Sequence, residues 1–171
     1  MEVSVSIAII TIGLVSIVSL FSSNIKAEIK NKNKLVAIYL ANESIEIVRQ
    51  QRDNNWFRGI DWRTGIPTGE AIIVPSNISE INREWDIKSI ANENKKKVYL
   101  DTDDIYLQRN VGIPANWQET KFKRHLIIRE NSGGGIAGCL GVTDCLEVIS
   151  RISVNGIQLA EVTAYFYDGW Y

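Results

Sequence analysis

Two cysteines lie close together near the C-terminal end of the chain, and thiols can bind metal, attack a substrate or pair with each other. Cys139 and Cys145 are the only cysteines, and the five residues between them include a glycine. Neither has a histidine beside it to activate it as a nucleophile. The short glycine-containing segment can close on itself, so we predict a Cys139–Cys145 disulfide in an exported domain.

The other candidates for chemistry are isolated side chains. Asp101, Asp103 and Asp104 offer oxygens that calcium accepts, but the twelve-residue loop of a calcium-binding hand is absent, and a polar turn is expected. His125, the only histidine, has no companion with metal-ligand spacing and is expected to be structural. Gly133–Gly135 is not followed by Gly-Lys-Ser/Thr, which argues against a phosphate loop. The sequence therefore predicts no catalytic residue, metal or cofactor, and a non-enzymatic protein.

Aromatic and basic side chains have ordinary structural explanations. Tryptophans can form platforms for sugars, but in a small exported head they more often fill the core. The five tryptophans are Trp56, Trp62, Trp85, Trp117 and Trp170. The lysine run Lys95–Lys97 is expected to be a solvated loop. Nineteen basic residues oppose twenty acidic ones, so the net charge of −1 gives no case for a nucleic-acid partner.

The N-terminal segment is the most distinctive element of the sequence. Residues 3–21 contain no charged side chain and, as a helix, reach roughly 28 Å, about the thickness of a hydrocarbon core. We predict a membrane-spanning helix; the alternative, a secretory signal peptide, lacks a basic start and a cleavage site. Glu2 precedes this segment, where a carboxylate is costly in lipid unless it is paired or stays at the interface. Gly13 lowers helix propensity within it and marks a place where the helix can loosen or pack closely.

The helix is expected to continue well beyond the membrane. No glycine occurs between Gly13 and Gly59 and no proline before Pro67, which predicts one helix from Val3 to about Asn54. Its second half carries a stripe with spacings of three and four that is expected to cover a sheet. The stripe comprises Leu35, Ile38, Asn42, Ile45, Val48 and Arg52.

Short β-branched and aromatic runs follow the helix. Residues 71–74, 97–100 and 105–108 predict short strands, with the aspartate run 101–104 as a hairpin turn. Residues 122–130, 146–154 and 158–167 predict an antiparallel meander whose last turn is Asn155-Gly156. The predicted fold class is α+β: a long N-terminal helix packed on a small antiparallel sheet. Residues 1–25 are expected to form the transmembrane and assembly helix, and residues 26–171 the head.

Three segments carry a resemblance to a known family. Residues 2–14 read EVSVSIAIITIGL, residues 40–49 read LANESIEIVR, and residues 161–170 read EVTAYFYDGW. The first resembles the start of type IV prepilins just after their cleavage site, and the other two are similar to the outer helix and final strands of such proteins. The resemblance implies a pilin or pseudopilin, in which Glu2 pairs with the N-terminal amine of a neighbouring subunit. It also implies other pilin subunits, a prepilin peptidase and a pilus assembly machinery as partners, and a leader upstream of Met1.

Two readings of location and function follow. Lys26, Lys30, Lys32 and Lys34 come after the apolar segment, and the positive-inside rule alone would keep them cytoplasmic. The cysteine pair and the strand-rich head instead favour an extracellular head on a single-pass membrane protein, within a cell-surface filament. The expected function is a structural subunit of a type IV pilus or of a filament like that of type II secretion. The alternative is a membrane-anchored ligand-binding protein that does not polymerise.

Overall fold

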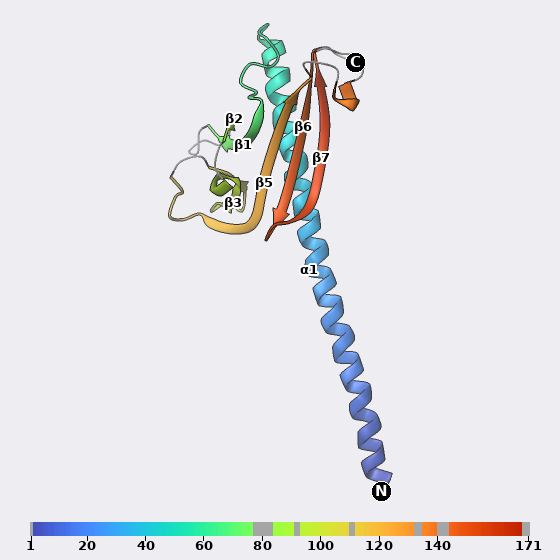
Figure 1. Cartoon of the computed structure of the whole chain (residues 1–171). Helices are drawn as coiled ribbons and strands as arrows, with labels where there is room; N and C mark the ends of the chain where they lie inside the picture. The colour runs from blue at the N-terminus through green and yellow to red at the C-terminus, as the bar shows by residue number, and fades with distance from the viewer. Residues whose placement is uncertain are drawn as a thin grey trace. The chain divides into compact units, whose positions relative to one another are not determined.

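The computed structural model describes residues 2–76, 84–90, 93–109, 112–131, 135–139 and 144–168. Two compact units make up the chain, Met1–Val36 and Ala37–Tyr171. One helix, α1 (Glu2–Phe57), supplies all of the described first unit and the start of the second (Figure 1). The rest of the second unit is built on an antiparallel sheet, so the α+β prediction is confirmed.

The first unit is a helix without a described apolar partner. From Glu2 to Lys32 every side chain that the structure describes is exposed. The most apolar window of 18 residues has a mean hydropathy of 2.5, so α1 is long and apolar enough to cross a membrane. The helix is unbroken because neither proline nor any pair of glycines interrupts it.

In the second unit, α1 buries a face rich in small residues. Ile45 and Val48 are buried as predicted, but Leu35 is 56% exposed and Asn42 is exposed, so the predicted stripe was partly wrong. Ala37, Leu40, Ala41, Ser44 and Ile47 are buried instead. Alanine and serine let the helix axis approach the sheet closely, and a search for large apolar side chains overlooks them.

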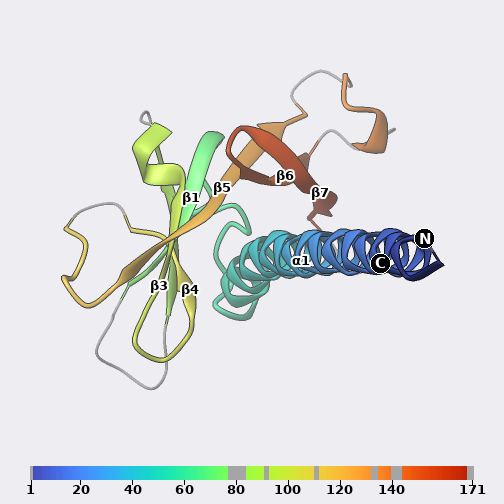
Figure 2. The ribbon, with the colours of Figure 1, turned by 90° about the horizontal axis from the view of Figure 1, so that it is seen from below.

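The seven strands form one sheet in which every pair is antiparallel. They are β1 (Gly69–Pro75), β2 (Trp85–Ser89), β3 (Lys97–Leu100), β4 (Tyr106–Leu107), β5 (Gln118–Glu130), β6 (Cys145–Val154) and β7 (Ile157–Tyr167). The long strand β5 pairs with β1 and β3 along one edge and with β6 along the other, and β7 follows β6. Figure 2 shows β5 crossing from the β3–β4 end of the sheet to the β6–β7 hairpin.

Two predicted turns are confirmed by their backbone geometry. Asn155 and Gly156 both have positive φ, 51° and 80°, which is the requirement of a type I′ hairpin between β6 and β7. Asp101 begins the β3–β4 turn, where its Oδ1 accepts hydrogen bonds from the backbone N–H groups of Asp103 and Ile105, both at 2.9 Å. This aspartate therefore organises a turn.

The main core lies between the head part of α1 and one face of the sheet. It combines Ile45 and Val48 with side chains from β1, β5, β6 and β7, such as Leu126 and Phe166. Trp62 is 3% exposed and belongs to this core, and Trp56 and Trp85 pack against it, as predicted for the tryptophans. Trp117 is half-buried, and Trp170 lies outside the described residues.

The lysine run differs from the prediction of a solvated loop. Lys95 and Lys96 end a short 3-10 helix, η1 (Glu93–Lys96), and Lys97 begins β3. The Lys96 side chain is only 6% exposed, and its Nζ lies 3.2 Å from Glu70 Oε2 on β1. A buried ammonium needs such a carboxylate, and a run of like charges in the sequence says nothing about partners supplied by another strand.

Candidate functional site

Helix α1 presents an apolar surface on every side between Val3 and Phe21. The large apolar side chains between Val3 and Phe21 are 51 to 73% exposed. Apolar surface this extensive marks a place that lipid or protein covers. Two of the hydroxyl groups within it bond to their own helix: Ser6 Oγ donates to Glu2 O at 3.0 Å and Ser16 Oγ to Ile12 O at 2.9 Å. Such bonds keep a polar side chain tolerable in an apolar environment.

The two assembly residues predicted from the sequence both belong to this surface. Glu2 lies in the first turn of α1, where the helix dipole favours a carboxylate, and among the described residues it has no ion-pair partner. Gly13 lies within the continuous helix, and apart from the neighbouring helix backbone no described atom lies within 4 Å of where a Cβ would stand. Within the part of the chain that the structure describes, no other segment packs against Gly13.

A buried ion pair connects the head part of α1 with the sheet. Arg124, in the middle of β5, is fully buried, and its Nη1 donates to Glu43 Oε2 on α1 at 2.7 Å. Its Nε donates to Gln108 Oε1 at 2.8 Å. Gln108 is also buried, and its amide nitrogen Nε2 donates to the carbonyl oxygens of Lys96 and Arg124. Sequence analysis did not find this network.

Burial and pairing act in opposite directions on Arg124. Loss of water lowers the pKa of the guanidinium, and the carboxylate of Glu43 acts to raise it; the net direction is down. Glu43 keeps about a third of its side chain exposed, at 34%. The pair therefore fixes how α1 lies on the sheet within the head and is a structural feature of that unit.

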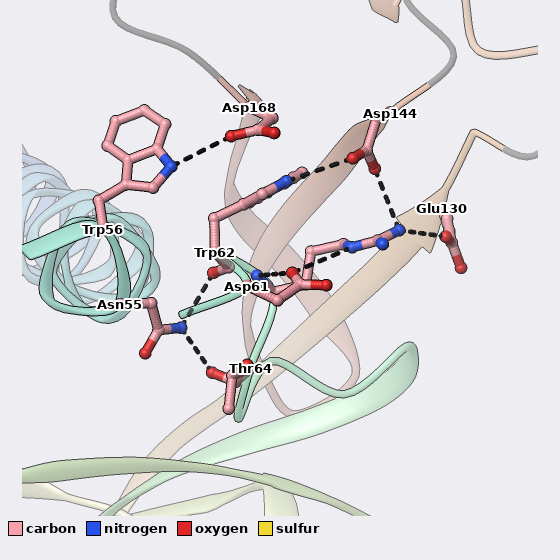
Figure 3. Close-up of polar contacts among 9 residues, drawn as sticks. Asn55, Trp56, Asp61, Trp62, Thr64, Glu130, Asp144 and Asp168 are labelled. Carbon is pink, nitrogen blue, oxygen red and sulfur yellow. Dashed lines mark hydrogen bonds and ion pairs between the residues drawn. The ribbon is translucent and has the colours of Figure 1, made fainter. Parts of the chain in front are cut away.

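A second polar cluster joins the loop after α1 to the ends of three strands (Figure 3). Arg63 Nη1 lies 2.8 Å from Glu130 Oε1 and 3.0 Å from Asp144 Oδ1, and its Nε lies 3.6 Å from Asp61 Oδ1. Burial acts to lower the pKa of Arg63, but contacts with Asp61, Asp144 and Glu130 outweigh it and raise the pKa. One cation thus holds three carboxylates from three separate segments together.

Tryptophan and asparagine side chains complete this cluster in Figure 3. Trp56 Nε1 donates to Asp168 Oδ1 at 3.2 Å, and Trp62 Nε1 donates to Asp144 Oδ2 at 3.3 Å. Asn55 is buried at the end of α1, and its Nδ2 donates to the carbonyl oxygens of Trp62 and Thr64. These bonds satisfy polar atoms where the helix stops, so the cluster is a built support for the end of the head.

The predicted disulfide joins Cys139 and Cys145 in this same region. Their Cα atoms are 5.9 Å apart, and both residues are buried. Asn131 N donates to Cys145 O at 3.0 Å, and Tyr167 Oη donates to Gly138 O at 2.5 Å. The bridge therefore ties the short 3-10 helix η2 (Ala137–Cys139) to the start of β6.

The remaining candidates have structural surroundings. His125 lies in β5 with its Nε2 3.0 Å from Glu70 Oε1. Gly133 and Gly134 lie outside the described residues. Within the described ranges, no three His, Cys, Asp or Glu side chains are grouped so that they could hold a metal ion. No family model, curated protein or solved structure matches the chain.

Proposed function

We propose that this chain is a structural subunit, major or minor, of a type IV pilus or of a related secretion filament, and that it assembles through α1. The single observation that supports this most is the division of α1. Its first part exposes apolar side chains on all sides, and its second part is buried against the head by one face only. A helix of this kind suits transfer from lipid to a bundle of identical helices.

The proposal requires two environments of similar free energy for the segment Val3–Phe21. Lipid covers its apolar side chains in the membrane, and neighbouring α1 helices cover them in the filament. Each environment removes apolar surface from water at about 25 cal/mol per Å². The subunit therefore loses little on leaving the bilayer, and small terms such as a charge pair decide which state is favoured.

Glu2 is the residue that would supply such a pair. A carboxylate inside a bundle of apolar helices is costly unless a cation neutralises it. Among the described residues of its own chain Glu2 has no such cation. The amine at the start of a neighbouring subunit is a cation at the right depth in the bundle, so the pair would set the axial register of adjacent subunits.

The head is placed outside the cell in this proposal. The Cys139–Cys145 disulfide is typical of compartments more oxidising than the cytosol. The Arg63 and Arg124 networks make the head a self-sufficient unit that does not need the first 36 residues for its core. Such a head can be carried unchanged from membrane to filament.

The test compares Glu2→Leu with Glu28→Leu, a matched loss of an exposed carboxylate on the same helix. Each variant is expressed from the chain's own locus, and the protein in membranes is compared with the protein in sheared, sedimented surface filaments. We expect membrane levels to hold in both variants and filaments to disappear in Glu2→Leu alone. Normal filament yield in Glu2→Leu would contradict the pairing role. A parent chain that never sediments as filament would favour a membrane-anchored ligand-binding protein.

A further inference from the structure

Four lysines follow the apolar segment of α1, and three of them share one side of the helix. Lys26, Lys30 and Lys34 are spaced by four residues, so they span only about 80° of the helix surface at 3.6 residues per turn. Lys32 lies about 160° away from Lys30 around the helix. All four are exposed and none has an ion-pair partner among the described residues.

The two sides of this helix segment differ in charge. Glu28 is the only acidic residue from 22 to 36, and it lies four residues before Lys32, so it accompanies that lysine on the opposite side. The side of Lys26, Lys30 and Lys34, here called the basic stripe, carries three positive charges and no negative one. One side of this helix segment is therefore positively charged, and the opposite side is close to neutral.

The distance of the basic stripe from the apolar segment matches the surface of a bilayer. At 1.5 Å per residue, Lys26 lies about 8 Å beyond Phe21, Lys30 about 14 Å and Lys34 about 20 Å. The headgroup layer is about 5 to 8 Å thick, and charges act across roughly another 8 Å at physiological salt. Long lysine side chains extend this reach towards the surface.

We infer that the basic stripe is a binding surface for the headgroups of anionic phospholipids. In this arrangement the spanning helix α1 is tilted, so that the side carrying the basic stripe leans towards the bilayer surface. A tilt of about 20° is ordinary for a spanning helix, and it lowers one side while it lifts the other. The inference rests on the membrane placement of α1, which the proposed function shares, and it does not require that a filament forms.

Anionic lipid is a better occupant than the head of a second copy of this chain. The stripe continues directly from the apolar segment, so lipid that covers Val3–Phe21 brings its headgroups to the lysines. The head's carboxylates are extensively used within the head: Glu43 pairs with Arg124, Glu119 with Lys97 and Glu161 with Arg151. Phosphate groups of lipid, by contrast, are unpaired anions at the required height.

The test uses the full chain in lipid nanodiscs, either of phosphatidylcholine alone or of phosphatidylcholine mixed with phosphatidylglycerol. The rate at which an uncharged, amine-reactive acylating reagent modifies each lysine is measured by mass spectrometry. Anionic lipid should slow the acylation of Lys26 about five-fold, the effect of about 1 kcal/mol per lysine at such a surface. The slowing should decrease in the order Lys26, Lys30, Lys34, Lys32, and high salt should abolish it.

The order of the last two lysines distinguishes a stripe from simple distance. Lys32 is about 3 Å nearer to the membrane along the helix axis than Lys34, yet it lies on the other side. Stronger protection of Lys32 than of Lys34 would overturn the stripe. Equal acylation in both lipids would overturn lipid binding, and protection that rises with protein density in neutral nanodiscs would assign the stripe to a second copy.

A second measurement counts phosphatidylglycerol molecules that stay with the chain after detergent purification. Replacing the basic stripe by glutamine should reduce that number, and a matched head variant should leave it unchanged. The two variants are Lys26→Gln/Lys30→Gln/Lys34→Gln and Lys88→Gln/Lys121→Gln/Lys123→Gln. Equal retention in both would also reject the inference. Lipid binding without filaments would reject only the proposed function, and filaments without a lipid preference only this inference.

Discussion

The two parts of helix α1 use apolar side chains in different ways. Between Val3 and Phe21 the large apolar side chains cover the whole circumference and are exposed. In the head, the apolar side chains of α1 that are buried lie on one face against strands, and only Tyr39 and Phe57 among its large apolar residues are exposed. The first pattern needs cover from all sides, which only lipid or several other helices provide. The second needs one sheet. A single helix thus combines a part that depends on its environment with a part that is satisfied within the chain.

Polar groups differ between the two parts in the same way. In the first part, Ser6 and Ser16 bond to carbonyl oxygens of their own helix, and the basic stripe has no described partner. In the head, Glu43 and Asn55 bond to residues outside α1. The head part of α1 and the sheet therefore stabilise each other. A substitution in this part should lower the stability of the head by an amount that depends on the contacts it removes.

The same aspartate should have different effects at two positions on α1, one in each part. Ile45 is 4% exposed in the core, so Ile45→Asp buries an unpaired carboxylate and should lower the free energy of unfolding by about 4 kcal/mol. Leu14 is 56% exposed, so Leu14→Asp should leave the thermal unfolding of the head unchanged. In the membrane it should instead weaken insertion by about 3 kcal/mol.

Both effects can be read from the full chain. Near-ultraviolet circular dichroism in detergent reports tertiary unfolding of the head, and carbonate extraction of membranes reports insertion. If Ile45→Asp unfolds at the parent's temperature, that face of α1 does not pack on the sheet. If Leu14→Asp stays in carbonate-washed membranes at the parent's level, the first part does not depend on lipid.

Local patterns explain which parts of this fold were predictable. The length of α1, the β5–β6–β7 meander and the Asn155-Gly156 turn depend on short-range periodicity and turn chemistry, and all were predicted. The buried face of α1 was only partly predicted. Ala41 and Ser44 are buried on this face, and Leu35 is exposed. Side-chain hydrophobicity alone would have predicted the reverse.

The ion pair of Glu43 and Arg124 tests the head part of α1 more finely. Glu43→Leu leaves a buried guanidinium without its carboxylate and should cost about 3 kcal/mol, the lower end for a broken buried pair because Glu43 is partly exposed. The matched control is Glu46→Leu, which removes an exposed carboxylate paired with Arg49 on the outer side and should change stability little. Chemical unfolding followed by tryptophan fluorescence measures both.

A double variant distinguishes pairing from simple loss of packing. Adding Arg124→Met to Glu43→Leu removes both charges, so it should recover much of the stability. A double variant no more stable than Glu43→Leu alone would mean that Gln108, and not Glu43, is the partner that matters to Arg124.

Separation in sequence explains which contacts of the head were not predicted. Cys139 and Cys145 are six residues apart, and their bridge was predicted. Glu43 and Arg124 are 81 residues apart, and Trp62 and Asp144 are 82 apart. No local pattern announces such partners, because they meet only after the sheet has formed. The sequence shows only that a charged residue or a tryptophan in a strand or loop needs a polar partner if it is buried. It does not show which residue that partner is.

The disulfide gives a smaller test within the head. Replacing Cys139 and Cys145 by alanine opens a short loop, and the chain-entropy model gives a loss of about 2 kcal/mol. The parent under reducing conditions should lose the same amount, and the variant should not respond to reductant. Mass measurement of the surface-exposed protein should show no free thiol; two free thiols would refute the bridge in the exported form.

The smallest expected effect is a pH dependence at the end of the head. The backbone N–H of Arg63 donates to Asp61 Oδ1 at 2.8 Å, and this bond lowers the pKa of Asp61, opposed by burial and aided by the Arg63 side chain. A carboxyl group whose pKa is lowered on folding stabilises the protein above its unfolded pKa, about 4. That stabilisation is lost as the pH falls through the lower, folded pKa.

Asp61→Asn keeps an oxygen acceptor for the backbone N–H of Arg63 but removes the charge. The melting temperature of the parent should therefore fall more steeply than that of the variant when the pH is lowered below about 4. Above that pH the two should differ by a small, constant amount that shrinks in high salt, because Asp61 is exposed to solvent. Parallel curves over the acid range would mean that Arg63 is held by Glu130 and Asp144 alone, and that the loop after α1 draws its order from Asn55 and the tryptophans.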